Sequence, residues 1–206
     1  MEDKKRILLI NTHQKYDGVS EGKLNKTLAG HAKSYFENKQ FEVMETFVNN
    51  GYDPTTEVEK HLRADLVIIQ TPVFWFNTPW IYKKYADEVF MEGLLSQKML
   101  NDDGRSRNDA TKQYGSGGNL DGKKVMVSAT WNAPIESFDN KSQAFLSGKS
   151  ANDVLFNVTL NYKFCGYDVL PNFHCFDVVK NPTIDLYMEQ YNTHLEIISK
   201  MIYNEN

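Results

Sequence analysis

Three short, mainly apolar runs, each followed by a polar stretch and a longer amphipathic segment, constrain the fold of this chain more than any other feature. The runs are residues 7–10, 66–69 and 125–129. Apolar runs of this length are typical of strands that are buried on both faces, whereas the segments between them repeat apolar residues at helical spacing. Strands that alternate with helices form parallel sheets through right-handed crossovers. We therefore expect an α/β protein built around a parallel sheet.

The same patterns predict the remaining elements. Residues 41–48 and 167–177 are strand-like, and Pro171 divides the second of these segments. The expected helices cover residues 24–36, 56–63, 79–92, 151–164 and 184–203. Five parallel strands with helices on both faces correspond to the flavodoxin-like arrangement with strand order 2-1-3-4-5. One such domain would account for residues 1–206.

The composition excludes several classes of protein. Of the 206 residues, 41% are hydrophobic and 13% aromatic, which is too much buriable surface for a disordered chain. The net charge of −4 offers no basic surface, so we expect no nucleic-acid partner. No apolar run reaches the roughly 18–20 residues of a membrane span, and the first is too short for a signal peptide. We expect a cytoplasmic protein without an integral membrane segment, in which Cys165 and Cys175 are free thiols.

The expected topology directs attention to one edge of the sheet. Ligands of parallel α/β sheets lie beyond the carboxyl ends of the strands, where the strand order reverses. In the order 2-1-3-4-5 this point lies between strands 1 and 3, so loops 11–25, 71–80 and 130–136 are candidates for a site. Segment 93–122 also stands out, because long connections with little periodicity are commonly functional.

Polar residues precede the first expected helix, where Ser20 is the expected N-cap. Free backbone N–H groups and the positive end of the helix dipole bind phosphate at such a position. Asn25 and Thr27 add neutral donors, and Lys23 adds a positive charge. The alternative is an ordinary capped helix. The loop lacks the Gly-x-Gly-x-x-Gly pattern, which argues against a directly held NAD.

Three consecutive aromatic residues, Phe74, Trp75 and Phe76, follow the third expected strand. Neighbouring side chains at a strand end point to opposite sides, so at least one ring is expected to face solvent. A planar ligand would explain these rings, because offset stacking adds about 0.5–1.5 kcal/mol per ring pair. A dimer interface is the alternative, since aromatic residues are also enriched there. Pro79 is expected at the first position of the helix that follows.

The fourth expected strand ends in Thr-Trp-Asn-Ala-Pro at residues 130–134. This turn offers a hydroxyl, an indole N–H, an amide and backbone N–H groups. Such donors suit the polar edge of a flavin ring, on which negative charge develops during reduction. The alternative is a proline-directed turn with a packed tryptophan.

Other chemistries are disfavoured. The glycine-rich segment 115–124 has partial Walker spacing, but Lys124 stands where a magnesium-binding hydroxyl is needed, and the loop enters a strand instead of leaving one. The histidines have no zinc-ligand spacing relative to the cysteines, so no metal site is expected. The adjacent His174 and Cys175 suit a strand with one residue on each face better than a catalytic pair.

Six separated motifs occur in one order along the chain. They are SEGKLNKT at 20–27, PWIYKKY at 79–85, DEVF at 87–90, GR at 104–105, KQYGSGG at 112–118 and TWNAP at 130–134. Together they resemble the flavodoxin-like NAD(P)H:quinone oxidoreductases, and within this group the modulator of drug activity B family. The resemblance covers nearly the whole chain. At 73–74 this sequence has Val-Phe where the family often has Gly-Trp.

The resemblance implies an FAD-binding protein, with FMN as the alternative cofactor. The residues that would hold the pyrophosphate end are Ser20, Gly22, Lys23, Leu24, Asn25 and Thr27. The loop beside the flavin ring would comprise Val73, Phe74, Trp75 and Phe76. The residues that would hold the polar edge of the ring are Thr130, Trp131, Asn132 and Ala133. Tyr114 would lie near the cofactor.

The reaction that the resemblance implies is a ping-pong hydride transfer from NADPH or NADH to flavin N5 and then, as two electrons, to a quinone. Tyr114 is the candidate catalytic residue, as a proton donor to the quinone oxygen, with cofactor packing as the alternative. The family also implies a homodimer with its active site at the subunit boundary. Two other functions stay open: a non-catalytic flavin electron carrier or regulatory subunit, and an FMN azoreductase-like enzyme.

Overall fold

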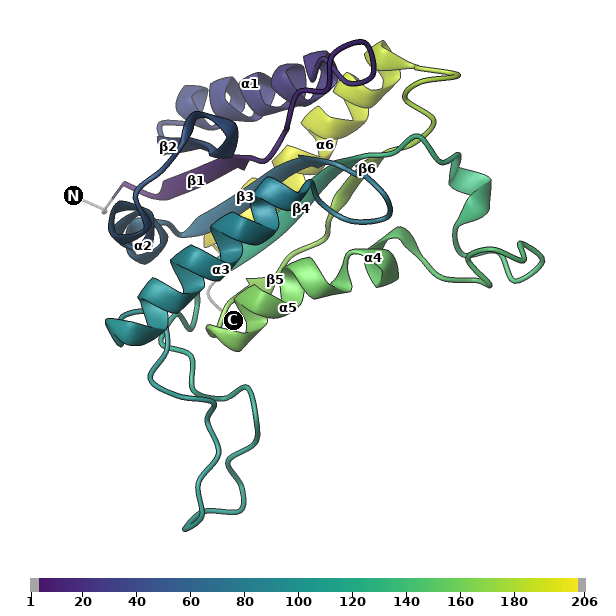
Figure 1. Cartoon of the computed structure of the whole chain (residues 1–206). Coiled ribbons are helices and arrows are strands. Elements are labelled where there is room, and N and C mark those ends of the chain that lie inside the picture. Colours follow the sequence, from purple (N-terminus) through teal and green to yellow (C-terminus); the bar gives the residue numbers. More distant parts are fainter. Residues whose placement is uncertain (1–3, 204–206) are drawn as a thin grey trace.

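A six-stranded sheet with parallel strand pairs runs through the centre of the computed structural model, which describes residues 4–203 (Figure 1). The strands are β1 (Arg6–Asn11), β2 (Glu42–Phe47), β3 (Leu66–Pro72), β4 (Lys124–Thr130), β5 (Asp168–Val169) and β6 (Phe173–Cys175). Their order is β2-β1-β3-β4-β5, and β6 pairs with β4 further along that strand. The predicted order 2-1-3-4-5 is therefore confirmed. Residues 1–3 and 204–206 of the predicted domain lie outside the described residues.

The fifth position in the sheet is shared by β5 and β6, as Pro171 in the sequence predicts. Proline has no N–H to donate to a neighbouring strand, and it interrupts regular pairing. At the break, Oδ1 of Asn172 accepts a hydrogen bond from the backbone N–H of Val127 at 2.8 Å. The side chain thus satisfies a buried donor that the interrupted strand does not reach.

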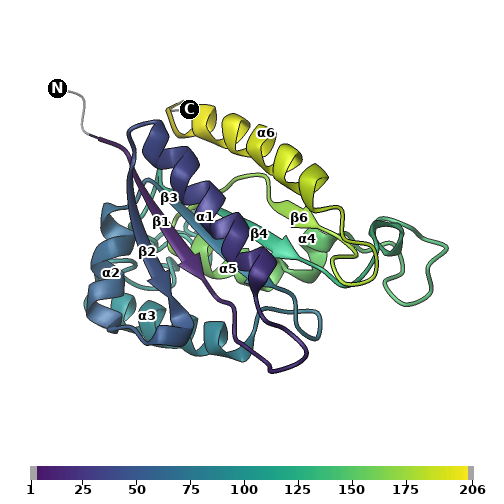
Figure 2. The ribbon, with the colours of Figure 1, turned by 90° about the horizontal axis from the view of Figure 1, so that it is seen from above.

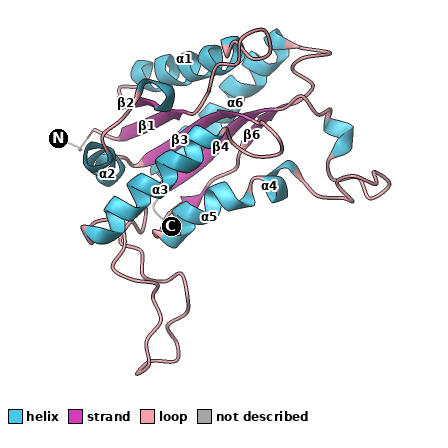
Figure 3. Ribbon diagram, viewed as in Figure 1, coloured by secondary structure: helices cyan, strands magenta, loops and turns pink. Residues whose placement is uncertain are grey.

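Helices cover both faces of the sheet (Figures 1 and 2). They are α1 (Lys23–Asn38), α2 (Pro54–Arg63), α3 (Trp80–Leu95), α4 (Ala151–Val154), α5 (Phe156–Phe164) and α6 (Ile184–Tyr203). Helices α1 and α6 pack on one face, and α2, α3 and α5 pack on the other. Two long loop segments project from this core at different ends (Figure 3). None of the helices within residues 4–203 combines the length and the apolar character that crossing a membrane requires.

Strand β3 shows how the two cores divide. All of its residues are buried. Val67 and Ile69 belong to the apolar cluster under α2 and α3, whereas Leu66 and Ile68 belong to the cluster under α1 and α6. This alternation follows from the pleat of a strand. Because both faces are covered, both sets must be apolar, which produces the continuous apolar run in the sequence.

The start of α1 differs from the prediction. Its N-cap is Gly22, not Ser20, and no side chain caps the helix. Gly22 has a φ of 72°, a left-handed conformation that glycine adopts without a steric cost. The Oγ of Ser20 lies instead 3.2 Å from Nε2 of His13. The first turn of α1 therefore keeps its backbone N–H groups free of any side-chain cap.

Three further helix boundaries also differ. Pro79 is the N-cap of α3 instead of its first residue, and α3 continues to Leu95, past the predicted end at 92. The predicted helix 151–164 is divided into α4 and α5 at Leu155, whose φ of −98° and ψ of 12° leave the helical region. The Leu155 side chain is buried in the core. Tertiary packing of this leucine thus accompanies a break that periodicity does not reveal.

Residues 97–119 form a projection that we call the arm, and it hangs from the end of α3 (Figure 1). An antiparallel bridge joins Leu100 to Gly118. A Cβ on Gly117 would lie 2.2 Å from the carbonyl oxygen of Asp102, and one on Gly118 would lie 2.1 Å from the carbonyl carbon of Cys165. These glycines therefore permit close backbone contacts within the arm and against the end of α5. These backbone contacts account for the glycine-rich sequence, so a phosphate ligand is not needed to explain it.

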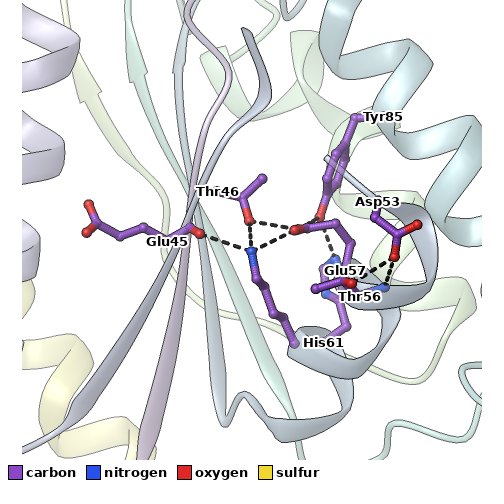
Figure 4. A network of polar contacts seen from close by, with 8 residues as sticks. Glu45, Thr46, Asp53, Thr56, Glu57, His61 and Tyr85 are labelled. Atoms are coloured by element: carbon purple, nitrogen blue, oxygen red, sulfur yellow. Dashed lines mark hydrogen bonds and ion pairs between the residues drawn. The ribbon is translucent and has the colours of Figure 1, made fainter. Parts of the chain in front are cut away.

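A buried polar network joins α2 to β2 and α3 (Figure 4). The carboxylate of Glu57 accepts hydrogen bonds from the hydroxyls of Thr46 at 2.7 Å and Tyr85 at 2.9 Å. The Nζ of Lys60 lies 2.7 Å from the same carboxylate and 2.8 Å from Oγ1 of Thr46. A buried carboxylate is tolerated only with such partners. The network therefore serves the packing of α2.

His61 extends this network, and we expect it to make the protein labile to acid. Its ring nitrogens lie 3.2 Å from the hydroxyls of Tyr167 and Tyr85. Burial lowers the pKa of His61 from 6.5 to about 3 in the folded protein. Between these values the unfolded chain binds a proton that the folded protein excludes, so the free energy of unfolding falls as the pH falls. When the pH is lowered from 7.5 to 5, protonation of this group in the unfolded chain should lower the free energy of unfolding by about 2 kcal/mol.

Urea unfolding at the two pH values measures this loss. The variant His61→Gln keeps a donor and an acceptor between the two tyrosines but does not titrate. Its free energy of unfolding should depend less on pH, by about the same 2 kcal/mol. If the variant loses as much stability at pH 5 as the parent protein does, His61 is not the source of the acid lability.

Candidate functional site

The carboxyl ends of β1, β3 and β4 bring three loops together at one edge of the sheet (Figures 1 and 2). The backbone N–H of Thr12, after β1, donates to the carbonyl oxygen of Gln70 in β3 at 3.0 Å. The N–H of Val73, after β3, donates to the carbonyl oxygen of Thr130 in β4 at 2.9 Å. The three loops singled out by the topology are thus held side by side by backbone contacts.

The first turn of α1 presents free donors at this edge. The first hydrogen bond of the helix runs from the N–H of Lys26 to the carbonyl oxygen of Gly22 at 2.9 Å. The N–H groups of Lys23, Leu24 and Asn25 make no hydrogen bond to the described residues. Unpaired N–H groups at the positive end of a helix dipole suit an anion such as a phosphate.

His13 lies directly over this turn, although the sequence reasoning did not single it out. Its ring would lie 2.4 Å from a Cβ on Gly22, so a larger residue at the N-cap would have to displace the ring. Burial lowers the pKa of His13. A single histidine in a polar loop has no neighbouring residues whose spacing would indicate a function. Only the fold places it at the start of α1.

A cavity of about 390 Å³ adjoins the same turn and extends to the end of β2. Lys15 and Lys26 contribute positive charges to its lining, His13 contributes an imidazole, and Glu21 contributes a carboxylate. Lys15 is paired with Asp17 at 2.6 Å and lies 3.5 Å from Glu21. The far end is lined by an aromatic ring and two amides, from Phe47, Asn49 and Asn50. The cavity is thus polar, partly basic and adjacent to free helix N–H groups.

Asn25 has a different position from the one expected of a phosphate ligand. Its side chain is buried, and its Oδ1 accepts from Nε2 of Gln70 at 2.9 Å. Its Nδ2 lies 3.1 Å from Oγ1 of Thr130. The amide therefore ties α1 to the ends of β3 and β4, and only the backbone N–H of Asn25 is free for an anion. Oε1 of Gln70 stays buried without a hydrogen-bond partner among the described residues.

The other predicted phosphate residues divide into two groups. Gly22, Lys23 and Leu24 lie at the free end of α1. The hydroxyl of Thr27 is on the exposed outer surface of the helix, and it donates to the carbonyl oxygen of Lys23 at 3.0 Å. Thr27 is thus one turn further along, with its hydroxyl already used.

The aromatic segment after β3 forms a tight, strained turn. The N–H of Phe74 donates to the carbonyl oxygen of Asn77 at 2.8 Å, and the N–H of Asn77 donates to the carbonyl oxygen of Phe74 at 3.1 Å. The two central residues, Trp75 and Phe76, have φ values of 50° and 64°. Turns of this kind favour Asn-Gly, and bulky residues with positive φ carry a steric cost.

This turn leaves Trp75 almost completely outside the protein, with 94% of its surface exposed. The prediction that at least one ring faces solvent is confirmed. The neighbouring rings contact other loops: Phe74 packs against Tyr16 at 5.5 Å, and Phe76 against Phe145 at 5.1 Å between ring centroids. Neither contact partner was predicted, because each is an isolated aromatic in a polar loop. Folding alone does not explain a strained turn that exposes a tryptophan.

In the turn after β4, the expectation that the indole N–H of Trp131 faces a ligand is wrong. Trp131 is buried, and its indole N–H donates to Nδ1 of His174 at 3.1 Å. The indole is therefore not free for a ligand, and the packed-tryptophan alternative is right for this side chain. The Oγ1 of Thr130 is likewise engaged by Asn25. The backbone N–H groups of Asn132 and Ala133 make no hydrogen bond within the described residues, and they are the donors that this turn offers.

His174 and its neighbours hold this turn in place. Because Nδ1 accepts from the indole, the proton of the neutral ring is on Nε2, which lies 3.0 Å from Oδ1 of Asn152. Burial lowers the pKa of His174 to about 4. His174 thus stays neutral near pH 7 and positions Trp131.

Tyr114 lies away from all of these residues. It is in the arm, 70% exposed, with its ring 5.2 Å from that of Phe164 at the end of α5. Helix α3 separates the arm from the aromatic turn, and a helix of 16 residues spans about 24 Å. Within one chain, the structure does not bring Tyr114 to the predicted site.

A second and larger cavity, of about 570 Å³, lies between α3, α5 and the arm. Its walls include Met91, Leu94, Leu160, Phe164 and Tyr114, and several of these side chains are exposed. This groove offers apolar surface and few polar groups.

Nucleophilic and metal chemistry find no support in the described residues. Burial raises the pKa of the Cys165 and Cys175 thiols to about 12, so both are protonated near pH 7. Residues 4–203 contain no group of three or more His, Cys, Asp or Glu side chains that could hold a metal ion. The site is a set of backbone donors and exposed rings, which suits an organic cofactor.

Comparison with known proteins gives consistent matches over nearly the whole chain. The model of a family described as flavodoxin-like fold matches residues 5–196. NADPH:quinone oxidoreductase MdaB of Haemophilus influenzae is 42% identical over 190 residues, which cover 92% of this chain and 97% of that protein. A Klebsiella pneumoniae structure described as a candidate quinone reductase superimposes with a TM-score of 0.73 at 21% identity, covering 98% and 86% of the two chains.

A second solved structure carries a ligand. General stress protein 14 of Treponema denticola, in complex with FMN, superimposes with a TM-score of 0.64 at 20% identity. The alignment covers 94% of this chain and 99% of that one. At these identities, the two structural matches establish the shared fold.

Proposed function

The chain belongs to the flavodoxin-like fold family and, within it, to the modulator of drug activity B group, and on this premise we propose that it is an FAD-dependent NAD(P)H:quinone oxidoreductase. The relative from Haemophilus influenzae that bears the name NADPH:quinone oxidoreductase is similar over almost its full length. The overall reaction takes a hydride from NAD(P)H and a proton from solvent, and it converts a quinone to a hydroquinone. The whole chain would act as one flavin-binding domain in the cytoplasm.

One observation carries the flavin proposal: a strained turn that exposes Trp75 and an uncapped helix N-terminus both lie at the sheet edge where the strand order reverses. Exposed aromatic surface suits a flat ring, and the free N–H groups suit its phosphates. The residues present thus fit a flavin. Gly22, Lys23 and Leu24 would hold the phosphate end, and the turn 73–77 would lie against the ring.

The cavity beside α1 favours FAD over FMN. An FMN ends at its single phosphate, which the first turn of α1 suffices to hold. FAD adds a second phosphate and an adenosine, which need more room. The cavity of about 390 Å³ supplies this room, with Lys15 and Lys26 for charge and Phe47 for stacking against a base.

The residues of the chain would contribute binding, orientation and electrostatics. A bound flavin would supply the redox chemistry, as the two-electron carrier between NADPH or NADH and the quinone, with hydride transfer at its N5 in a ping-pong sequence. The free N–H groups of Asn132 and Ala133 would face the polar edge of the ring and stabilise negative charge there. His174, through Trp131, would keep these donors in position.

A homodimer would complete the site. Tyr114 is about one helix length from the aromatic turn of its own chain, so it can lie near the cofactor only if a second copy supplies it. The apolar groove between α3 and α5, beside the arm, would be the surface that the copies share. Tyr114 would then be a candidate proton donor to the quinone oxygen.

The proposed function is tested with the purified protein. We expect a yellow protein that releases FAD on denaturation, identified by mass. Under anaerobic conditions NADPH should bleach the flavin band rapidly, and a benzoquinone should restore it. Slow bleaching with a persistent one-electron-reduced spectrum would indicate an electron carrier instead, and released FMN would favour the azoreductase-like alternative.

A further inference from the structure

The loop that follows Trp131 presents an aromatic side chain that the proposed function does not use. Phe145 lies in this loop and is 73% exposed. The loop is closed at its base by a hydrogen bond from the N–H of Asp139 to the carbonyl oxygen of Lys149 at 3.1 Å. A second bond, from Nδ2 of Asn140 to the carbonyl oxygen of Glu136 at 3.2 Å, holds its start. The loop therefore keeps its shape by polar contacts that do not involve Phe145.

Phe145 meets the strained turn through Phe76. Their ring centroids are 5.1 Å apart, and the ring planes are inclined by 51°. Phe76 is itself 45% exposed, and its φ is positive. Two exposed rings from different loops bury little surface against each other, so this pair adds little to folding. The pair therefore presents two partly exposed rings to solvent.

We propose that Phe145 is a specificity-determining residue for the electron acceptor, stacking on the outer ring of bicyclic quinones. This inference rests on the proposed function. A one-ring quinone that lies against the flavin would not need to contact Phe145. If the turn 73–77 lies against the flavin, the second ring of a naphthoquinone would reach Phe145, which stands beside Phe76. Aromatic stacking there would favour two-ring acceptors.

Three variants distinguish an effect of aromatic stacking by Phe145 from an effect of its apolar volume. Phe145→Ala removes the ring, Phe145→Leu keeps apolar volume without a ring, and Phe145→Tyr keeps the ring. Since Phe145 is largely exposed, none of them should disturb folding. The measurements are kcat/KM for 1,4-naphthoquinone and for 1,4-benzoquinone, the dissociation constant of FAD, and the rate of flavin reduction by NADPH.

We expect Phe145→Ala and Phe145→Leu to lower kcat/KM for naphthoquinone by about three- to tenfold, as loss of one aromatic pair predicts. For benzoquinone the change should stay below about twofold. Phe145→Tyr should keep the parent selectivity. The FAD dissociation constant and the flavin reduction rate should not change in any variant.

Several results would overturn the inference. An equal loss for both quinones, or weaker FAD binding, would mean that Phe145 only supports the loop. A leucine variant with parent selectivity would mean that stacking is not involved. If the parent protein turns over both quinones and the alanine variant keeps its selectivity, only this inference fails. If the parent protein reduces neither quinone, the proposed function itself fails.

Discussion

Replacement of Trp75 by glycine should weaken FAD binding about thirtyfold, while the protein without cofactor becomes more stable. Loss of one aromatic stack against a nucleobase costs about 1–3 kcal/mol, and we expect a similar cost for a flavin ring. The stability gain has another cause. Trp75 holds a φ of 50° and is 94% exposed, so glycine removes backbone strain and gives up almost no packing. The strain costs about 1–2 kcal/mol, of which the flexibility of unfolded glycine cancels part.

Trp75→Ala is the matched control for this prediction. It removes the ring as glycine does, but it keeps a Cβ at positive φ. Both variants should lose FAD affinity equally in a fluorescence titration, and in urea the glycine variant should be more stable than the alanine variant by about 0.5–1 kcal/mol. Unchanged affinity in both variants would remove Trp75 from the cofactor site. Equal stability would mean that the turn is not strained.

The largest change in activity is expected from mixing two variants that each have low activity at limiting FAD. If the arm of one copy completes the site of the other, Trp75→Ala and Tyr114→Ala damage the same site from different chains. A heterodimer of these variants then has one doubly altered site and one intact site. Random exchange of subunits places half of the chains in heterodimers, so the mixture should recover about a quarter of the parent quinone reductase activity.

The mixing experiment has its own control. The double variant Trp75→Ala/Tyr114→Ala, mixed with either single variant, forms no dimer with an intact site, so it should not recover activity. Failure of the two single variants to complement each other, in a preparation shown to exchange subunits, would contradict the role of a partner-supplied Tyr114. A protein that elutes as a monomer and is fully active would contradict the dimer itself.

The fold was predictable because burial on both sides of a parallel sheet leaves a strong sequence pattern. Residues 66–69 are a continuous apolar run because α1 and α6 cover one face of β3 while α2 and α3 cover the other. The break in the fifth strand was also predictable, because Pro171 has no N–H to donate to the neighbouring strand. The break at Leu155 was not, since it depends on core packing that periodicity does not encode.

The site was only partly predictable, because a sequence lists polar groups without saying which of them are already paired. Asn25 and Trp131 were expected to face a cofactor, and the structure engages their side chains with Gln70, Thr130 and His174. The groups that remain free are backbone N–H groups, which every residue except proline possesses and which no motif reports. Strand geometry predicted that at least one of the three consecutive rings faces solvent, but it predicted neither that this ring is Trp75 nor that its φ is positive.

His13 and Phe145 were missed for a related reason. Each is an isolated ring in a polar loop, with no periodic neighbour to mark it. Only the return of the chain to the same edge of the sheet places His13 over Gly22 and Phe145 beside Phe76. Tyr114 is the opposite case, since the motif identified it but the fold of a single chain holds it at the far end of α3.

A flavin titration of the purified, cofactor-stripped protein tests the central claim most directly. Addition of FAD should saturate at one equivalent per chain and quench flavin fluorescence, because a ring that lies against Trp75 is stacked on an indole. FMN, which lacks the adenosine, should bind more weakly. A colourless protein that takes up neither FAD nor FMN would contradict the account, leaving the exposed tryptophan and the open helix end without their ligand.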